Sequence, residues 1–241
     1  CDPLRIYERI RIAQPDVVYH LAAHANVRAS ARDSGLVFET NTRGTFNLLE
    51  AMREAGPQYR RIIFASSCSV YGEPTSFPSG EYTSAMPVQT SLYGASKLAG
   101  EALCQAYDST YGFHSTIMRL VSQLGPGQTR GHLPDLFAKL RHNPSKLVVM
   151  GNGQQKRSYM HVADCVEALI HVGLNFLPAV LGIFNVSNQH PWTVVQSIDA
   201  PLKDKQSNDK IAVQAWGVKG GDRYLLDTVN GHMSYAQAKR A

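Results

Sequence analysis

The sequence predicts an α/β fold: a parallel sheet with helices on its faces, followed by a smaller and less regular lobe. Short β-rich runs alternate with helical patterns over residues 1–122, as in sheets whose parallel strands are connected by helices. From residue 123 the chain becomes rich in Gly, Pro and Gln. We therefore expect a main domain over residues 1–122 and a lobe over residues 123–241, with some later segments returning to the main sheet.

Three strands and two helices are predicted in the main domain. The strands are apolar runs bounded by turn residues, and they cover residues 15–23, 60–67 and 114–121. The helices cover residues 41–56 and about 93–112, and each ends at a glycine. In the second helix, Ala95, Leu98, Ala99, Ala102, Leu103 and Ala106 form an apolar face, which we expect to pack on the core.

The predicted elements of the lobe are shorter and more widely spaced. We expect a helix inside residues 123–145, a short strand at 146–151, a helix at 161–175 and a strand at 182–187. Residues 199–210 are polar and predict a loop, and the tail from 234 to 241 has a helical pattern.

Composition excludes several classes of function. The net charge is +5, but the basic residues are scattered, which argues against nucleic-acid binding and fits a small anionic ligand. The four cysteines lie far apart without a C-x-x-C pair, so we expect no metal site and no disulfides, and a cytoplasmic protein. No apolar stretch reaches the roughly 18 residues that cross a membrane, so no membrane partner is expected either.

Candidate catalytic groups lie at the ends of predicted strands, where open parallel sheets bind ligands. Tyr93 and Lys97 share a face of their helix because they are four residues apart, and Ser67 ends the preceding strand. A phenol titrates near ~10, and we expect the ammonium of Lys97 to lower that value and make Tyr93 a usable base. Taken alone, the pair also fits a surface Tyr beside a solvated Lys. Ordinary turn chemistry is the favoured interpretation of Ser69.

Five motifs occur in one order: "HLAA" (20–23), "NTRGTFNLLEA" (41–51), "SSCSVYG" (66–72), "YGASK" (93–97) and "GNGQQKRSYMHVADCVEA" (151–168). Together they resemble the extended short-chain dehydrogenase/reductase family, in particular its sugar-nucleotide epimerases and dehydratases. The resemblance implies a Rossmann-like doubly wound sheet, a substrate-binding C-terminal lobe, NAD as cofactor and a nucleotide-sugar substrate. It also implies a homodimer formed through the helices at 41–56 and 95–111.

The same resemblance implies a role for individual residues. The catalytic residues would be Ser67, Tyr93 and Lys97. Cofactor contacts would come from Leu21, Ala22, Ala23, Asn41, Ser66, Tyr93 and Lys97, and substrate contacts from Ser122, Arg157 and Asp222. Two of these residues have simpler interpretations, because Asn41 could cap a helix and Arg157 could be a surface residue.

Three features depart from the family pattern. A Gly-rich turn that holds the cofactor pyrophosphate is expected ahead of Cys1, so we expect residues 1–241 to be part of a longer protein and not to bind NAD tightly alone. The glycines of "GPGQTRG" (125–131) have the wrong spacing and position to replace it. Ser122 stands where these enzymes usually have Asn, and Lys219 replaces the Arg of a late Arg-x-Gly-Asp motif that ends here at Asp222.

The residues after Ser67 favour one reaction within the family. Dehydratase relatives commonly carry an acidic residue there for later acid–base steps, whereas this chain has Cys68 and Ser69. The sequence therefore favours a nucleotide-sugar epimerase that acts through transient oxidation at C4, of the UDP-glucose/UDP-galactose type. A dehydratase or reductase of the same family, and a non-catalytic binding relative, are the alternatives.

Overall fold

A computed structural model describes most of the first 187 residues and three short later segments. The described residues are 2–73, 79–82, 88–149, 156–175, 182–187, 192–193, 213–219 and 222–229. They form two compact units, described separately below. The first unit combines residues 1–121 with residues 166–186, and the second combines residues 122–165 with residues 187–241.

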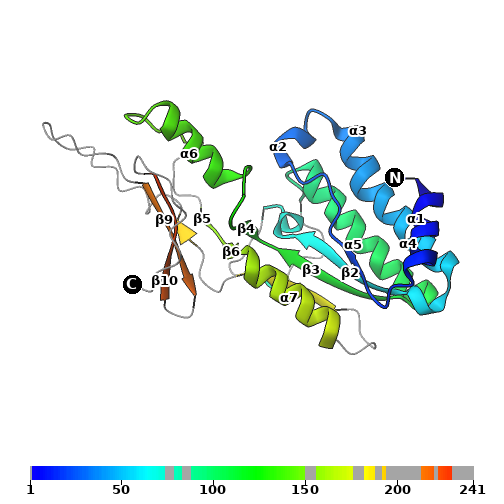
Figure 1. Cartoon of the computed structure of the whole chain (residues 1–241). Helices are drawn as coiled ribbons and strands as arrows, with labels where there is room; N and C mark the ends of the chain where they lie inside the picture. The colour runs from blue at the N-terminus through cyan, green and yellow to red at the C-terminus, as the bar shows by residue number, and fades with distance from the viewer. Residues whose placement is uncertain are drawn as a thin grey trace, which may run out of the picture. The chain divides into compact units, whose positions relative to one another are not determined.

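The first unit is built on a parallel four-stranded sheet with the order β1-β2-β3-β7 (Figure 1). Its strands are β1 (Val18–His20), β2 (Arg61–Ser67), β3 (His114–Leu120) and β7 (Gly182–Val186). β2 and β3 are central, and most of their residues are buried on both faces, which explains their continuous apolar runs. The predicted α/β class and its parallel sheet are therefore confirmed.

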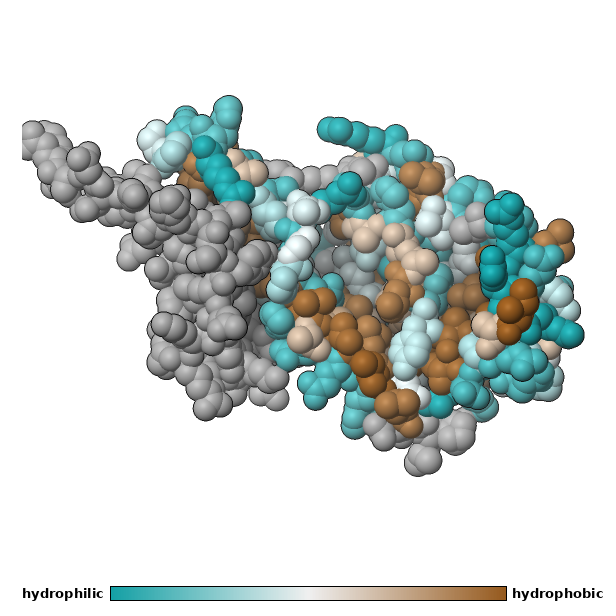
Figure 2. Space-filling view, in the orientation of Figure 1, coloured by the Kyte–Doolittle hydropathy of each residue, from teal (hydrophilic) through white to brown (hydrophobic). Residues whose placement is uncertain are grey.

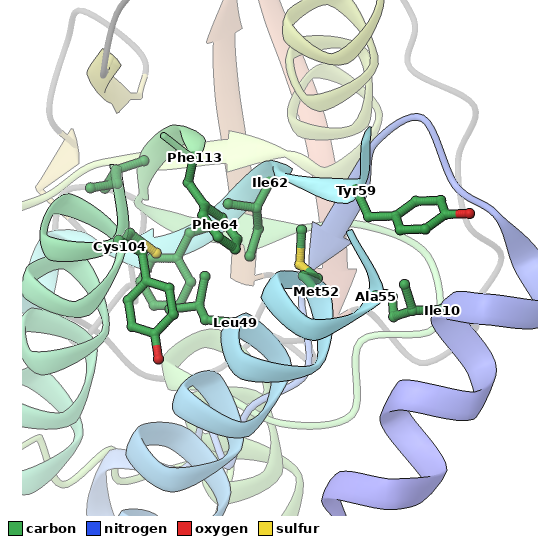
Figure 3. Close-up of a cluster of buried hydrophobic side chains, with 11 residues drawn as sticks. Ile10, Leu49, Met52, Ala55, Tyr59, Ile62, Phe64, Cys104 and Phe113 are labelled. Carbon is green, nitrogen blue, oxygen red and sulfur yellow. The ribbon is translucent and has the colours of Figure 1, made fainter. Parts of the chain in front are cut away.

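Helices cover both faces of this sheet. One face carries α1 (Pro3–Ala13), α4 (Gly44–Ala55) and α5 (Leu92–Tyr111), and their apolar side chains meet those of the sheet in the cluster of Figure 3. The other face carries α7 (Val162–Asn175), where Gly173 packs against the phenol of Tyr19 on β1. Short helical turns complete the unit: α2 (Val27–Ser30), α3 (Ser34–Val37), the π-helix η1 (Phe38–Arg43), and the 3₁₀ turns η2 (Pro57–Tyr59) and η3 (Cys68–Tyr71).

Local sequence signals set the ends of the long helices. Asp2 accepts a hydrogen bond from the backbone N–H of Leu4 and begins α1, with Pro3 in the first helical position. Ser91 caps α5 by accepting from Gly94 N at 3.0 Å, and Gly112, with φ +67°, ends it in the left-handed conformation. No helix was predicted for the residues of α1, which are largely exposed apart from Ile10.

One prediction about elements is confirmed only in part, and another is wrong. Leu103 of the predicted apolar face of α5 packs on the core, whereas Ala102 and Ala106 are exposed. The buried residues of α5 include Lys97, Glu101, Cys104 and Tyr107. Residues 146–149 of the predicted short strand form no strand. The predicted loop at 199–210 and the helical tail lie outside the described residues.

The second unit contains short pairs of strands and one helix. β4 (Ser122–Leu124) pairs in parallel with β6 (Tyr159–His161), and Leu124 and Tyr159 pack with Leu136 of α6 (His132–His142). Two antiparallel pairs follow: β5 (Lys156–Arg157) with β8 (Trp192–Thr193), and β9 (Val213–Lys219) with β10 (Asp222–Val229).

Exposed apolar side chains gather along α7. Val166, Ile170 and Leu174 recur every four residues and are each close to half exposed or more, and Figure 2 shows the hydrophobic surface over this helix. Within the described ranges, no helix combines the length and the hydrophobicity needed to cross a membrane.

Candidate active site

Ser67, Tyr93 and Lys97 come together at the carboxyl end of β2. Ser67 is the last residue of that strand, and its hydroxyl accepts from the backbone N–H of Ser69 as the chain turns into η3. Tyr93 lies in the first turn of α5 and shares a side-chain hydrogen bond with Ser67. Lys97, one turn further along α5, donates from Nζ to the carbonyl oxygen of Ala65 at 2.7 Å.

Lys97 is held in a buried position against β2. Only 4% of the residue is exposed, and its Nζ lies 5.0 Å from the centre of the Phe64 ring, where the ring face attracts a cation. Burial lowers the pKa of Lys97 to about 8. The ammonium therefore persists at neutral pH but lies close to its titration point.

The environment of Tyr93 differs from the sequence-based expectation. Burial raises the pKa of its phenol above the ordinary value, and the hydrogen bond with Ser67 offsets part of that rise. The expected lowering by Lys97 is not found, because the ammonium is engaged by Ala65 and the cost of burying a phenolate is larger. Ser67 is the group that favours the phenolate in this structure.

Asn41 joins three parts of the site. Its Oδ1 accepts from the backbone N–H of His24 at 2.7 Å, and its Nδ2 donates to the His24 carbonyl at 3.2 Å and to Ser96 Oγ at 2.9 Å. It lies within the π-helix η1, a distortion that is frequent at functional sites. Asn41 is therefore no helix cap: it ties the segment after β1 to α5.

The segment after β1 offers an open edge beside this site. Leu21 and Ala22 are exposed and Ala23 is half-buried, so a flat ligand can approach the backbone here. Ser66, by contrast, is buried, and its hydroxyl donates to Glu101 Oε1 at 2.5 Å. The Ser66 side chain is thus committed to Glu101, and any contact of Ser66 with a cofactor would involve its backbone.

Three polar residues near the site escaped the sequence analysis: His20, Glu101 and Arg119. His20, at the end of β1, shares a hydrogen bond with Thr45 Oγ1 at 2.9 Å, and its pKa falls to about 4 through burial and the nearby charge of Lys97. Thr45 in turn donates to the Asn41 carbonyl. The sequence did contain a signal for His20, because it is a polar residue at the end of the apolar strand "VVYH".

The predicted substrate residues belong to the second unit. Ser122 begins β4 and is exposed, Arg157 ends β5, and Asp222 begins β10. Their roles stay predictions.

Comparisons with known proteins identify the family of the chain. The family model described as the NAD dependent epimerase/dehydratase family matches residues 1–186. The chain is 36% identical over 158 residues to an uncharacterized UDP-glucose epimerase, YtcB, of Bacillus subtilis, covering 65% of this chain and 48% of that protein. It is 33% identical over 181 residues to a putative UDP-glucose 4-epimerase of Methanocaldococcus jannaschii, covering 73% and 57%. The chain thus spans about half the length of these curated relatives.

The chain is also similar to solved structures of nucleotide-sugar 4-epimerases. A UDP-galactose 4-epimerase superposes with a TM-score of 0.67 at 34% identity, covering 77% of this chain and 60% of that one. UDP-glucuronic acid 4-epimerase from Bacillus cereus, in complex with UDP-glucuronic acid and NAD, superposes with a TM-score of 0.70 at 27% identity, covering 83% and 62%.

Proposed function

The chain belongs to the NAD-dependent epimerase/dehydratase family, and we propose that it epimerises a nucleotide sugar, of the UDP-glucose/UDP-galactose type, at C4. The observation that carries this proposal is the convergence of Ser67, Tyr93 and Lys97 at the end of β2. A phenol paired with a hydroxyl can exchange a proton with a sugar hydroxyl, which is the acid–base step that oxidation of an alcohol requires.

NAD fits the residues around this site. The open backbone edge at Leu21, Ala22 and Ala23 suits a flat dinucleotide, and Asn41 fixes the end of that edge through His24. The Lys97 ammonium, whose charge acts on His20 directly before this edge, would be the donor for ribose hydroxyls. When bound, NAD supplies the hydride acceptor and, in the return step, the hydride donor.

The chain's own residues handle the proton and the orientation of the sugar. In its phenolate form Tyr93 accepts the proton of the C4 hydroxyl at its Oη and becomes a neutral phenol, while Ser67 hydrogen-bonds the same sugar oxygen and holds it toward Tyr93. Before this transfer the hydrogen bond with Ser67 offsets part of the cost of ionising Tyr93, and the Ala65 carbonyl holds the Lys97 ammonium in place as a donor toward the cofactor ribose. In the return step Tyr93 gives the proton back after the keto sugar has presented its other face.

The residues after Ser67 favour epimerisation over dehydration. Cys68 follows Ser67 directly, and burial raises the pKa of its thiol to about 11, so it stays protonated at neutral pH and does not replace a catalytic carboxylate. A dehydratase of this family, which shares the C4 oxidation, or a reductase of the family is the second candidate. A non-catalytic relative would have no use for the retained Ser67, Tyr93 and Lys97.

We further propose the partners and compartment. The nucleotide end of the substrate would be bound by Ser122, Arg157 and Asp222 of the second unit, with the Arg157 guanidinium on the diphosphate or the nucleoside. A homodimer would form through α4 and α5, since Ala102 and Ala106 of α5 and Phe46 of α4 are exposed apolar residues. The widely spaced cysteines, of which Cys68, Cys104 and Cys165 are free, fit a reducing cytoplasm.

The proposal is tested by the identity of the product. Protein expressed from the complete coding sequence is incubated with NAD and UDP-glucose, and the nucleotide sugars are separated by anion-exchange chromatography. We expect UDP-galactose. A 4-keto-6-deoxy sugar would instead identify a dehydratase, and no conversion of any UDP- or dTDP-linked hexose would contradict the enzymatic function.

A further inference from the structure

Three successive residues of β2 contact one face of α5. Their partners on the helix recur every four residues, so that they form a straight row along it. The contacts are Ser67 with Tyr93, Ala65 with Lys97 and Ser66 with Glu101. Two of these three contacts involve the proposed catalytic residues, and the third involves residues without a role in the reaction described above.

The third contact rests on a buried ion pair. Glu101 is fully buried, and Arg119 of β3 binds it through two hydrogen bonds, Nε to Oε1 at 2.9 Å and Nη2 to Oε2 at 2.7 Å. Ser66 donates a third hydrogen bond to the same carboxylate at 2.5 Å. A buried carboxylate is retained only when its charge and lone pairs are satisfied in this way. The pair therefore joins β2, β3 and α5 at one point.

Arg119 also reaches the segment that connects Ser67 to Tyr93. Its Nη1 donates to the carbonyl oxygen of Glu81 at 2.9 Å and to Tyr71 Oη at 3.0 Å. Asn185 of β7 binds the same segment, because its backbone N–H donates to Glu81 Oε1 at 2.9 Å. The guanidinium thus lies between the helix that carries the catalytic base and the connection that leads to it.

We propose that Glu101 and Arg119 are positioning residues for the acid–base step, which act by fixing the end of β2 against α5. This inference rests on the proposed function. Ser66 is the neighbour of Ser67, so the hydrogen bond to Glu101 sets where the Ser67 hydroxyl lies relative to Tyr93. Proton transfer is sensitive to displacements of an ångström or less, whereas folding tolerates them.

A matched control exists on the same helix. Ser115 of β3 is fully buried, and its hydroxyl donates to Asp108 of α5 at 2.5 Å. Ser66→Ala and Ser115→Ala therefore each remove a buried hydrogen bond from a strand serine to an α5 carboxylate. They differ in place, since Ser115 lies near the start of β3 and Ser66 lies at the carboxyl end of β2.

The experiment compares the two variants in three measurements. We expect both to lose a similar amount of thermal stability. Only Ser66→Ala should lower kcat, by roughly 10-fold or more, with KM for the nucleotide sugar little changed. Only Ser66→Ala should raise the pKa of the Tyr93 phenol, measured from phenolate absorbance as the difference between each protein and the same protein carrying Tyr93→Phe. Equal effects of the two variants on kcat and on this pKa would overturn the proposal.

The test remains decisive if the activity is absent or a variant does not fold. If the unmodified protein turns over no nucleotide sugar, the proposed function fails, and the titration of Tyr93 alone decides the positioning role. If Ser66→Ala does not fold, Ser66→Cys and Ser115→Cys replace the pair, because a thiol keeps the volume and is a weaker donor. The same contrast between the two positions is then expected with a smaller loss of kcat.

Discussion

Tyr93 lies at the candidate active site in surroundings that raise the pKa of its phenol and so disfavour the ionised form. Burial opposes the phenolate, and the hydrogen bond with Ser67 offsets only part of the effect. The catalytic value of the site therefore depends on contacts that favour the charged phenol when substrate and cofactor are bound.

Removing the Tyr93 hydroxyl tests this role. We expect Tyr93→Phe to lower turnover by roughly 10²-fold or more, the usual contribution of a general base, and to leave the fold intact. Steady-state kinetics and circular dichroism measure the two effects. Tyr111→Phe is the control, because Tyr111 lies at the other end of α5 and is 40% exposed. Near-normal turnover in Tyr93→Phe would remove this residue from the mechanism.

His20 makes stability depend on pH. Its pKa is about 4 in the folded protein against an ordinary 6.5, so the unfolded chain binds more protons between these values. Stability is therefore fully present above pH 6.5 and is lost as the pH falls toward 4, by roughly 3 kcal/mol for this group alone.

Denaturant unfolding of His20→Gln between pH 7 and pH 4 measures this contribution. We expect its stability to fall less on acidification than that of the unmodified protein. His142→Gln, at an exposed position of α6, should follow the unmodified protein. Parallel pH curves for His20→Gln and the unmodified protein would show that His20 is not held neutral by the fold.

The ends of the helix α5 were easier to predict from the sequence than the face of the helix that is buried. Its cap at Ser91 and its end at Gly112 are local signals that the sequence displays. Its buried face was misassigned because Lys97 and Glu101 look like solvent-facing residues. Their partners, Ala65 and Arg119, are far away in the sequence, and no local pattern reveals such pairing. For the same reason the positioning pair was invisible before the structure.

Gly100 allows α5 to approach β2 closely. A Cβ at this position would lie 2.5 Å from Cζ of Phe64, the ring that faces the Lys97 ammonium. Helix propensity alone predicts that Gly→Ala stabilises a helix by up to about 1 kcal/mol. We expect the opposite here, a loss of roughly 1–3 kcal/mol from overpacking, together with reduced activity.

Chemical denaturation of Gly100→Ala measures this loss. Gly35→Ala is the control, because Gly35 lies in α3, is exposed and has open space around its Cα, so the same substitution should be neutral or stabilising. A Gly100→Ala protein as stable and active as the unmodified one would show that the helix and the strand have room to separate.

At the scale of the whole molecule, the order of the motifs in the sequence predicted the sheet. That sheet brings Ser67, Tyr93 and Lys97 together. Alternation of strands and helices was enough to predict a parallel sheet, since it follows from the connections rather than from any single residue. The π-helix at Asn41 was not predictable, because its extra residue is stabilised by contacts with His24 and Ser96. The prediction of a short strand at 146–151 was wrong over residues 146–149, because a brief apolar run does not specify a pairing partner.

The reaction itself is tested most directly by the fate of the hydrogen at C4. Protein from the complete coding sequence is incubated with NAD and UDP-glucose that carries deuterium at C4, and the product is analysed by NMR and mass spectrometry. Transient oxidation at C4 within one active site predicts UDP-galactose that retains the deuterium at C4, and Tyr93→Phe should form it far more slowly. A product that has lost its deuterium to solvent, or one whose C4 configuration is unchanged, would contradict the central claim that these residues catalyse epimerisation at C4.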